Sequence, residues 1–160
     1  AYASNNIFTS LTSSAGDVCI VIRTLDHIGI TVKDLDKSLF FYSKLLGFPV
    51  LKRKMNAELK VAYALVQVGQ SAIEILSPIE EEPSSQKTVE DGMEGVGMKI
   101  RRQTGLNHIS LTVDDIEGIH KELKSRGIQF IVEPESTGSG SKIAFFTDPD
   151  GNLLELIQRP

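Results

Sequence analysis

Apolar and polar residues alternate in two segments of the chain, which begin at Leu25 and at Leu106. In each segment one row of alternate positions is apolar, and the other row begins with a histidine. The apolar rows are Ile28, Ile30 and Val32 in the first segment and Ile109, Leu111 and Val113 in the second. A period of two is typical of β-strands with one buried face. The pattern therefore predicts two strands, with His27 and His108 on the face opposite the apolar row.

A helical pattern follows each predicted strand. Asp34 is a good N-cap for the first helix, and Gly47 ends it. In the second half, Asp114 or Asp115 precedes the helix and Gly127 closes it. The apolar positions at helical spacing are Leu35, Leu39, Tyr42 and Leu46 in the first helix and Ile116, Ile119 and Leu123 in the second.

Three strand-like runs follow each helix, so each half has the order β-α-β-β-β. The runs are 48–54, 59–68 and 71–76 in the first half and 128–132, 142–147 and 152–157 in the second. The predicted fold class is α+β. Two tandem βαβββ modules, 25–78 and 106–160, are expected to form a curved, cup-like mixed sheet with the helices on the outside.

The segments outside the two modules carry weaker patterns. Residues 79–105 are expected to be a loop that is first acidic and then rich in glycine. Two interpretations of this loop stay open, a solvated linker and a mobile flap over a site. Residues 1–24 are expected to be an N-terminal tail, in which the β-branched run 17–22 is compatible with an extra strand.

The two halves also repeat polar residues within their strands. The histidines His27 and His108 are 81 positions apart (108 − 27), and the same step leads from Glu74 to Glu155 (74 + 81). A lone strand histidine is more often structural than a ligand, but burying an unpaired carboxylate is costly. Two imidazoles and two carboxylates suit a divalent first-row metal such as Zn, Ni, Co, Mn or Fe(II). We therefore predict that these four residues form one metal site.

Composition and charge restrict the partners of the chain. Its 160 residues are 41% apolar and 24% charged, with a net charge of −4, which argues against a general nucleic-acid binder. No apolar run approaches the roughly 18 residues of a membrane span. The single cysteine, Cys19, excludes an intrachain disulfide and fits a reducing compartment, the cytoplasm or an organelle matrix.

Basic residues at two places have open interpretations. The run Lys52-Arg53-Lys54 lies in a predicted strand, where a solvated face is the more common interpretation and anion binding is the alternative. Arg101 and Arg102, just before the second module, are candidates to meet an anionic substrate tail. The other candidate residues lining a substrate pocket are Tyr63, Leu65 and Phe146.

Five motifs between residues 25 and 156 carry a resemblance to a known family. They are Leu-Asp-His-Ile at 25–28, Phe-Tyr-x-x-Leu-Leu-Gly-Phe at 41–48, Ile-Glu-Ile-Leu at 73–76, Leu-Asn-His-Ile at 106–109 and Asp-Pro-Asp-Gly-Asn-Leu-Leu-Glu-Leu at 148–156. Together they resemble the vicinal oxygen chelate superfamily of glyoxalases, bleomycin-resistance proteins and extradiol dioxygenases. By position, the resemblance implies the metal ligands His27, Glu74, His108 and Glu155. Family members pair their modules within a chain or across a dimer, and a homodimer is expected here.

The resemblance also implies an activity, that of a metal-dependent lyase or isomerase. A small-molecule substrate with vicinal oxygens chelates the metal, which stabilises the enediolate formed when a carbon-bound proton leaves. A ligand carboxylate carries the proton in glyoxalase I-like members, and the catalytic candidates here are Glu155, which is favoured, and Glu74. Residues 144–151 resemble lactoylglutathione lyase (glyoxalase I), whereas residues 73–78 resemble methylmalonyl-CoA epimerase, the alternative.

Two further classes of function are kept for comparison. An Fe(II) extradiol dioxygenase needs only His27, His108 and Glu155, which leaves Glu74 unexplained. A non-catalytic antibiotic-binding protein of the bleomycin-resistance type has a cup without a metal, and such proteins lack the four ligands that this chain carries.

Overall fold

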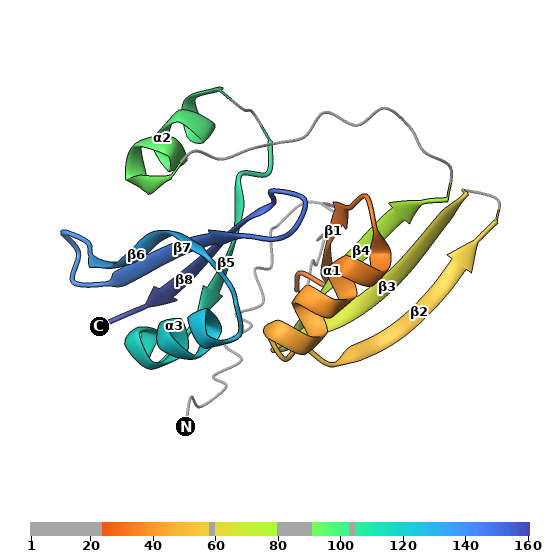
Figure 1. The fold of residues 1–160 in the computed structure, drawn as a ribbon, viewed down its shortest axis with the longest axis horizontal. Coiled ribbons are helices and arrows are strands. Elements are labelled where there is room, and N and C mark those ends of the chain that lie inside the picture. Colours follow the sequence, from red (N-terminus) through yellow and green to blue (C-terminus); the bar gives the residue numbers. More distant parts are fainter. Residues whose placement is uncertain (1–23, 58–59, 80–90, 103–104) are drawn as a thin grey trace, which may run out of the picture.

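The computed structural model describes residues 24–57, 60–79, 91–102 and 105–160 (Figure 1). Almost all of the predicted tail, including the run 17–22, and much of the join between the modules lie outside these ranges. No helix in the described ranges has the length and apolar character needed to span a membrane.

The first module forms a four-stranded mixed sheet with a helix on one face (Figure 1). Its strands lie in the order β1 (His27–Thr31), β4 (Ser71–Pro78), β3 (Val61–Val68) and β2 (Val50–Asn56). β1 and β4 are parallel, and the other pairs are antiparallel. The helix α1 (Leu35–Leu39) continues into a π-helical segment, η1 (Phe40–Leu45).

The second module repeats this arrangement in a sheet of its own. The strand order is β5 (His108–Thr112), β8 (Leu153–Gln158), β7 (Lys142–Thr147) and β6 (Phe130–Ser136), with α3 (Ile116–Ser125) on one face. The parallel pair is again the first and last strand of the module. The predicted α+β fold of two βαβββ modules is confirmed, and each module forms a separate four-stranded sheet.

The capping residues fix where the main helices begin and end. The side chain of Asp34 accepts hydrogen bonds from two backbone N–H groups in the first turn of α1. Asp115, rather than Asp114, caps α3 through a backbone N–H at 3.0 Å. Gly47 and Gly127 adopt φ values of 80° and 92°, a left-handed conformation that glycine accepts with little strain.

One hydrophobic core is shared by both modules. It consists of buried side chains from the helices and from the sheet faces that the helices cover. These are Ile30, Val32, Leu35, Phe41, Tyr42, Ala64, Val66, Ile73 and Ile75 of the first module and Ile109, Ile116, Leu123, Ile128, Ala144, Phe146, Leu154 and Leu156 of the second. Because the apolar rows of β1 and β5 enter this core, the histidines of the alternate rows lie on the opposite faces.

A buried polar link also joins the two modules. The Tyr42 hydroxyl donates a hydrogen bond to Asp148 Oδ2 at 2.9 Å. The carboxylate of Asp148 further accepts bonds from the backbone N–H groups of Asp150 and Asn152 and from the Asn152 amide. Burial, with the nearby Asp148 charge, raises the pKa of Tyr42 far above its ordinary value, so the phenol stays a donor. The turn at 148–152 of the second module therefore also connects it to the first module.

The join between the modules contains a helix, α2 (Gly92–Arg102), where the sequence predicted a loop. Its Val96 is only 2% exposed. It packs on the face of the second sheet opposite α3, in a cluster with Val132, Ile143, Phe145 and Leu153. Glycine-rich segments have low intrinsic helix propensity, so this helix owes its stability to tertiary burial, which the local composition does not reveal.

The link between Tyr42 and Asp148 predicts a stability effect. Tyr42→Phe keeps the ring in the core but removes the donor, so the free energy of unfolding should fall by about 1–3 kcal/mol. Urea denaturation followed by circular dichroism measures the change. Tyr63→Phe is the matched control because Tyr63 is less buried and lies outside this core. Equal losses in the two variants would contradict the role given to the Tyr42 hydroxyl.

Candidate metal site

The first module brings a histidine and a glutamate together on adjacent strands. β1 and β4 pair in parallel, with Gly29 opposite Glu74. His27 lies two residues before Gly29 and therefore on the same face of the sheet. His27 Nε2 lies 3.6 Å from Glu74 Oε2, and both side chains are partly exposed. This face is the one opposite α1.

The second module repeats this pair with nearly the same geometry. Ser110 of β5 lies opposite Glu155 of β8, and His108 stands two residues earlier on the same face. His108 Nε2 lies 3.5 Å from Glu155 Oε2. The agreement between the two distances shows that the 81-residue repeat preserves side-chain geometry as well as residue type.

Each histidine is held at its other ring nitrogen by the residue before it. His27 Nδ1 lies 2.8 Å from Asp26 Oδ2, and His108 Nδ1 lies 3.1 Å from Asn107 Oδ1. These two partners are also 81 positions apart (107 − 26). An Nδ1–H that donates to an oxygen leaves the Nε2 lone pair directed at the glutamate. The sequence interpretation missed Asp26 and Asn107, although the repeat offset marks both.

The partners of the two histidines differ in charge. The hydrogen bond to the Asp26 carboxylate raises the pKa of His27 above its ordinary value, outweighing the effect of desolvation, and the Glu74 charge adds to the rise. Asn107 is neutral. A histidine next to a carboxylate is a more basic ligand, so the contact with Asp26 favours His27 as a nitrogen donor.

The spacing within each pair fits two ligands of one metal ion. With metal–ligand bonds of about 2.0–2.2 Å, two donor atoms on a tetrahedral ion lie about 3.4 Å apart. The measured N···O separations of 3.6 and 3.5 Å need little adjustment to meet that value. Each pair can therefore supply two ligands, which is half of a structural or catalytic coordination shell.

The four predicted ligands do not converge within one chain. Among the described residues, no three histidine, cysteine, aspartate or glutamate side chains form a group that could hold a metal. The chain brings together His27 with Glu74 and His108 with Glu155, and the two pairs stay separate. Each chain thus presents two candidate half-sites. The first half-site is His27 with Glu74, on the sheet face opposite α1, and the second half-site is His108 with Glu155, on the face opposite α3.

The aromatic neighbour of the second half-site is Phe145. It lies opposite Glu155 across β7 and β8, and its ring centre is 5.8 Å from that of His108 in an edge-on arrangement. Phe146, which the sequence interpretation placed in the pocket, points into the shared core and is 0% exposed. The correction follows from strand alternation, because neighbouring residues of β7 face opposite sides.

Two of the other predicted pocket residues, Leu65 and Tyr63, lie in the first sheet. Leu65 lies opposite Glu74, and Tyr63 lies opposite Leu76, so both are on the face that carries the ligands. Arg101 and Arg102 form the end of α2. The side chains of these two arginines lie outside the described part of the structure.

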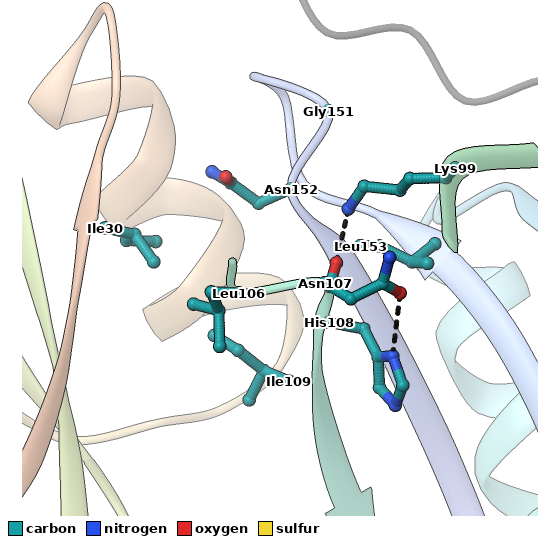
Figure 2. A pocket seen from close by; sticks show the side chains of 9 residues that line it. All are labelled: Ile30, Lys99, Leu106, Asn107, His108, Ile109, Gly151, Asn152 and Leu153. Atoms are coloured by element: carbon teal, nitrogen blue, oxygen red, sulfur yellow. Dashed lines mark hydrogen bonds between the residues drawn. The ribbon is translucent and has the colours of Figure 1, made fainter. Parts of the chain in front are cut away.

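A small pocket opens at the start of β5, beside His108 (Figure 2). Lys99 of α2 extends toward β5, and its ammonium donates to the backbone carbonyl of Asn107. The same view shows the His108 ring held by the Asn107 side chain. The pocket is lined by Ile30, Lys99, Leu106, Asn107, His108, Ile109, Gly151, Asn152 and Leu153. The linking helix α2 is thereby tied to the strand that carries a candidate ligand.

A family model and named relatives match most of the chain. The model described as Glyoxalase/Bleomycin resistance protein/Dioxygenase superfamily matches residues 24–156. A probable lactoylglutathione lyase of Vibrio cholerae is 31% identical over 134 residues, which cover 82% of this chain and 88% of the relative. The human mitochondrial methylmalonyl-CoA epimerase is 28% identical over 137 residues, which cover 84% of this chain and 73% of the relative.

The fold has counterparts among solved structures. A glyoxalase family protein from Enterococcus faecalis superimposes with a TM-score of 0.67 at 24% sequence identity, and the match covers 84% of this chain and 97% of that one. At this level of identity the likeness concerns the fold. It agrees with the arrangement of two four-stranded mixed sheets described above.

The contacts at the histidine Nδ1 atoms predict an effect on metal affinity. Asn107→Ala should weaken binding of Zn²⁺ about 10- to 100-fold, because the ring of His108 loses the partner that fixes its orientation and tautomer. Asp26→Ala should act in the same way through His27. Competition with a chromophoric chelator measures the affinity. Asn107→Asp, which keeps an acceptor oxygen, should restore binding, whereas Gln129→Ala, an exposed site on the same module, should leave it unchanged. Unaltered affinity in both alanine variants would contradict the positioning role.

Proposed function

Because this chain belongs to the Glyoxalase/Bleomycin resistance protein/Dioxygenase superfamily, we propose that it is a metal-dependent lyase or isomerase. It moves a proton between adjacent carbons of a small molecule that carries neighbouring oxygens. The observation that carries this proposal is the His–Glu pair, present in both modules with N···O distances of 3.6 and 3.5 Å.

A divalent cation fits the donors of this chain. His27 and His108 offer nitrogen, Glu74 and Glu155 offer oxygen, and this mixture suits Zn, Ni, Co, Mn or Fe(II). When bound, the cation supplies Lewis acidity that favours loss of a carbon-bound proton next to a carbonyl. The presence of all four donors favours a metal-dependent lyase or isomerase over an Fe(II) dioxygenase, in which Glu74 has no role. It also favours this class over a binding protein without a metal, which needs none of the four.

The glutamates have a second task in this proposal. Glu155 takes the proton from the substrate carbon and returns it to the neighbouring carbon, with Glu74 as the alternative base. Phe145 lies beside Glu155 and His108 and shields that side of the site from water. Water exclusion keeps the proton on the carboxylate between its removal and its return.

The lactoylglutathione lyase reaction is the first candidate for this chemistry. The Vibrio cholerae relative of that name is aligned over 88% of its length. The human methylmalonyl-CoA epimerase supports a second candidate, because its alignment also covers most of this chain. Both reactions begin with removal of a proton next to a carbonyl, so the same carboxylates are candidates for that first step. They differ in the second step, because an epimerase returns a proton to the same carbon from the opposite face, a task for Glu74 and Glu155 acting as a pair. A reducing compartment such as the cytoplasm, inferred from the single cysteine, stays a prediction.

A homodimer completes the site in this proposal. The first half-site of one chain would face the second half-site of its partner, so that two His and two Glu would be available to hold each of two ions. Three features support the pairing. The described residues of one chain hold only pairs of ligands; β1 and β5 are the outer strands of their sheets; and Leu25 and Leu106, which precede the histidines, are 59% and 57% exposed. Large exposed apolar side chains beside unpaired strand edges are typical of an interface.

The proposed chemistry predicts how a single carboxylate change acts. Glu155→Gln keeps the size and one oxygen of the side chain but cannot accept the proton, so kcat should fall about 10²- to 10⁴-fold. Turnover is measured with the methylglyoxal–glutathione adduct and with methylmalonyl-CoA, each with several divalent metals. Glu133→Gln, an exposed glutamate of β6, is the control for loss of one charge.

Two outcomes would count against these assignments. Full turnover by a metal-bound Glu155→Gln variant would remove the role given to Glu155. Failure of the unaltered protein to turn over either substrate with any metal would remove both named reactions.

A further inference from the structure

Two lysines of β2 lie on the ligand-bearing face of the first sheet. Lys52 pairs with Leu65 of β3, which pairs in turn with Glu74 of β4. Lys54 pairs with Tyr63 in the neighbouring row. Cross-strand partners point to the same side of a sheet, so both lysines share the face of Glu74. The sequence left the role of the run Lys52-Arg53-Lys54 open. In the structure, two of its three side chains lie on the face that carries the first half-site.

Among the described residues, only the positive charge on the α1 side of this run has an ion-pair partner. Arg53 points to the side of α1, where its Nη1 lies 2.8 Å from Asp36 Oδ1. The Lys52 ammonium lies 5.2 Å from the centre of the Tyr63 ring, a cation–π contact that leaves its charge uncompensated. Within the described part of the chain, neither Lys52 nor Lys54 forms an ion pair. A positive edge thus borders the half-site of a protein whose net charge is −4.

The distance from this edge to the ligand pair suits one small molecule. Neighbouring strands lie about 4.8 Å apart, so the backbone of Lys52 is about 10 Å from that of Glu74. Leu65 lies between them in the same row, and Tyr63 stands next to it. A molecule that reaches from the glutamate to the lysines must therefore lie across an apolar and aromatic floor.

We propose that Lys52 and Lys54 bind an anionic group of the substrate, a carboxylate or a phosphate, whose reacting end lies at the His27–Glu74 half-site. This inference rests on the proposed function and extends it to the substrate class. The substrate has neighbouring oxygens at one end, an apolar middle over Leu65 and Tyr63, and an anion within about 10 Å. Small neutral carbonyl compounds lack the last feature and are selected against.

Equilibrium binding tests the inference without relying on turnover. Glutathione, which carries carboxylates, and coenzyme A, which carries phosphates, are titrated into the metal-loaded full-length protein at low ionic strength. Replacing Lys52 and Lys54 together with Gln should weaken binding of the preferred probe about tenfold, an effect that shrinks at high salt. The Lys52→Arg and Lys54→Arg double variant keeps both charges and should bind normally. Arg53→Gln removes one charge from the same strand on the other face and should bind normally as well.

The outcome also separates this inference from the proposed function. Preference for glutathione assigns a carboxylate, and preference for coenzyme A assigns a phosphate. Equal affinity in the unaltered protein and the double Gln variant, an equal loss in Arg53→Gln, or no binding of either probe would overturn the role of the lysines. If metal affinity and turnover were normal in the same samples, the proposed function would survive that result. If turnover failed but the lysine-dependent binding were present, the function would fall and the anion site would stand.

Discussion

The alternation of side chains along β1, β4, β5 and β8 is the constraint on which the structure depends. Every second residue of these strands enters the core shared by the two modules, so the residues between them must face the other way. His27, Glu74, His108 and Glu155 occupy those remaining positions. A shift of one residue in register would bury all four polar side chains and expose the apolar rows, so packing of the core also fixes the geometry of the half-sites.

The same constraint separates the two half-sites of a chain. The modules join through their helix-covered faces, with the hydroxyl of Tyr42 bound to Asp148 at the boundary. The ligand pairs therefore lie on faces that the shared core does not include. The two faces also differ from one another. Val96 of α2 packs on the second face, where it extends the apolar surface around Phe145, whereas Lys52 borders the first. A site formed between the first face of one chain and the second face of another has an apolar, enclosed side near Phe145 and a positively charged side near Lys52.

Much of this arrangement could be predicted from the sequence because its signals are local and repeated. The period of two residues located the strands, the caps at Asp34 and at Asp114 or Asp115 located the helices, and the 81-residue step located the four candidate ligands. Other features depend on contacts between distant segments. The helix α2 is stabilised by burial of Val96 against the second sheet, which its glycine-rich sequence does not encode. The choice between Phe145 and Phe146 required the register of β7 against β8.

The central claim is that each metal ion is shared between the first half-site of one chain and the second half-site of another. Heterodimers of a His27→Gln chain and a His108→Gln chain, isolated with two different tags, test it directly. Each such dimer has one site with both changes and one site with none, so it should bind about half as much Zn²⁺ as the unaltered dimer. The two variant homodimers should bind little. A heterodimer that binds no more metal than the variant homodimers would contradict the shared site.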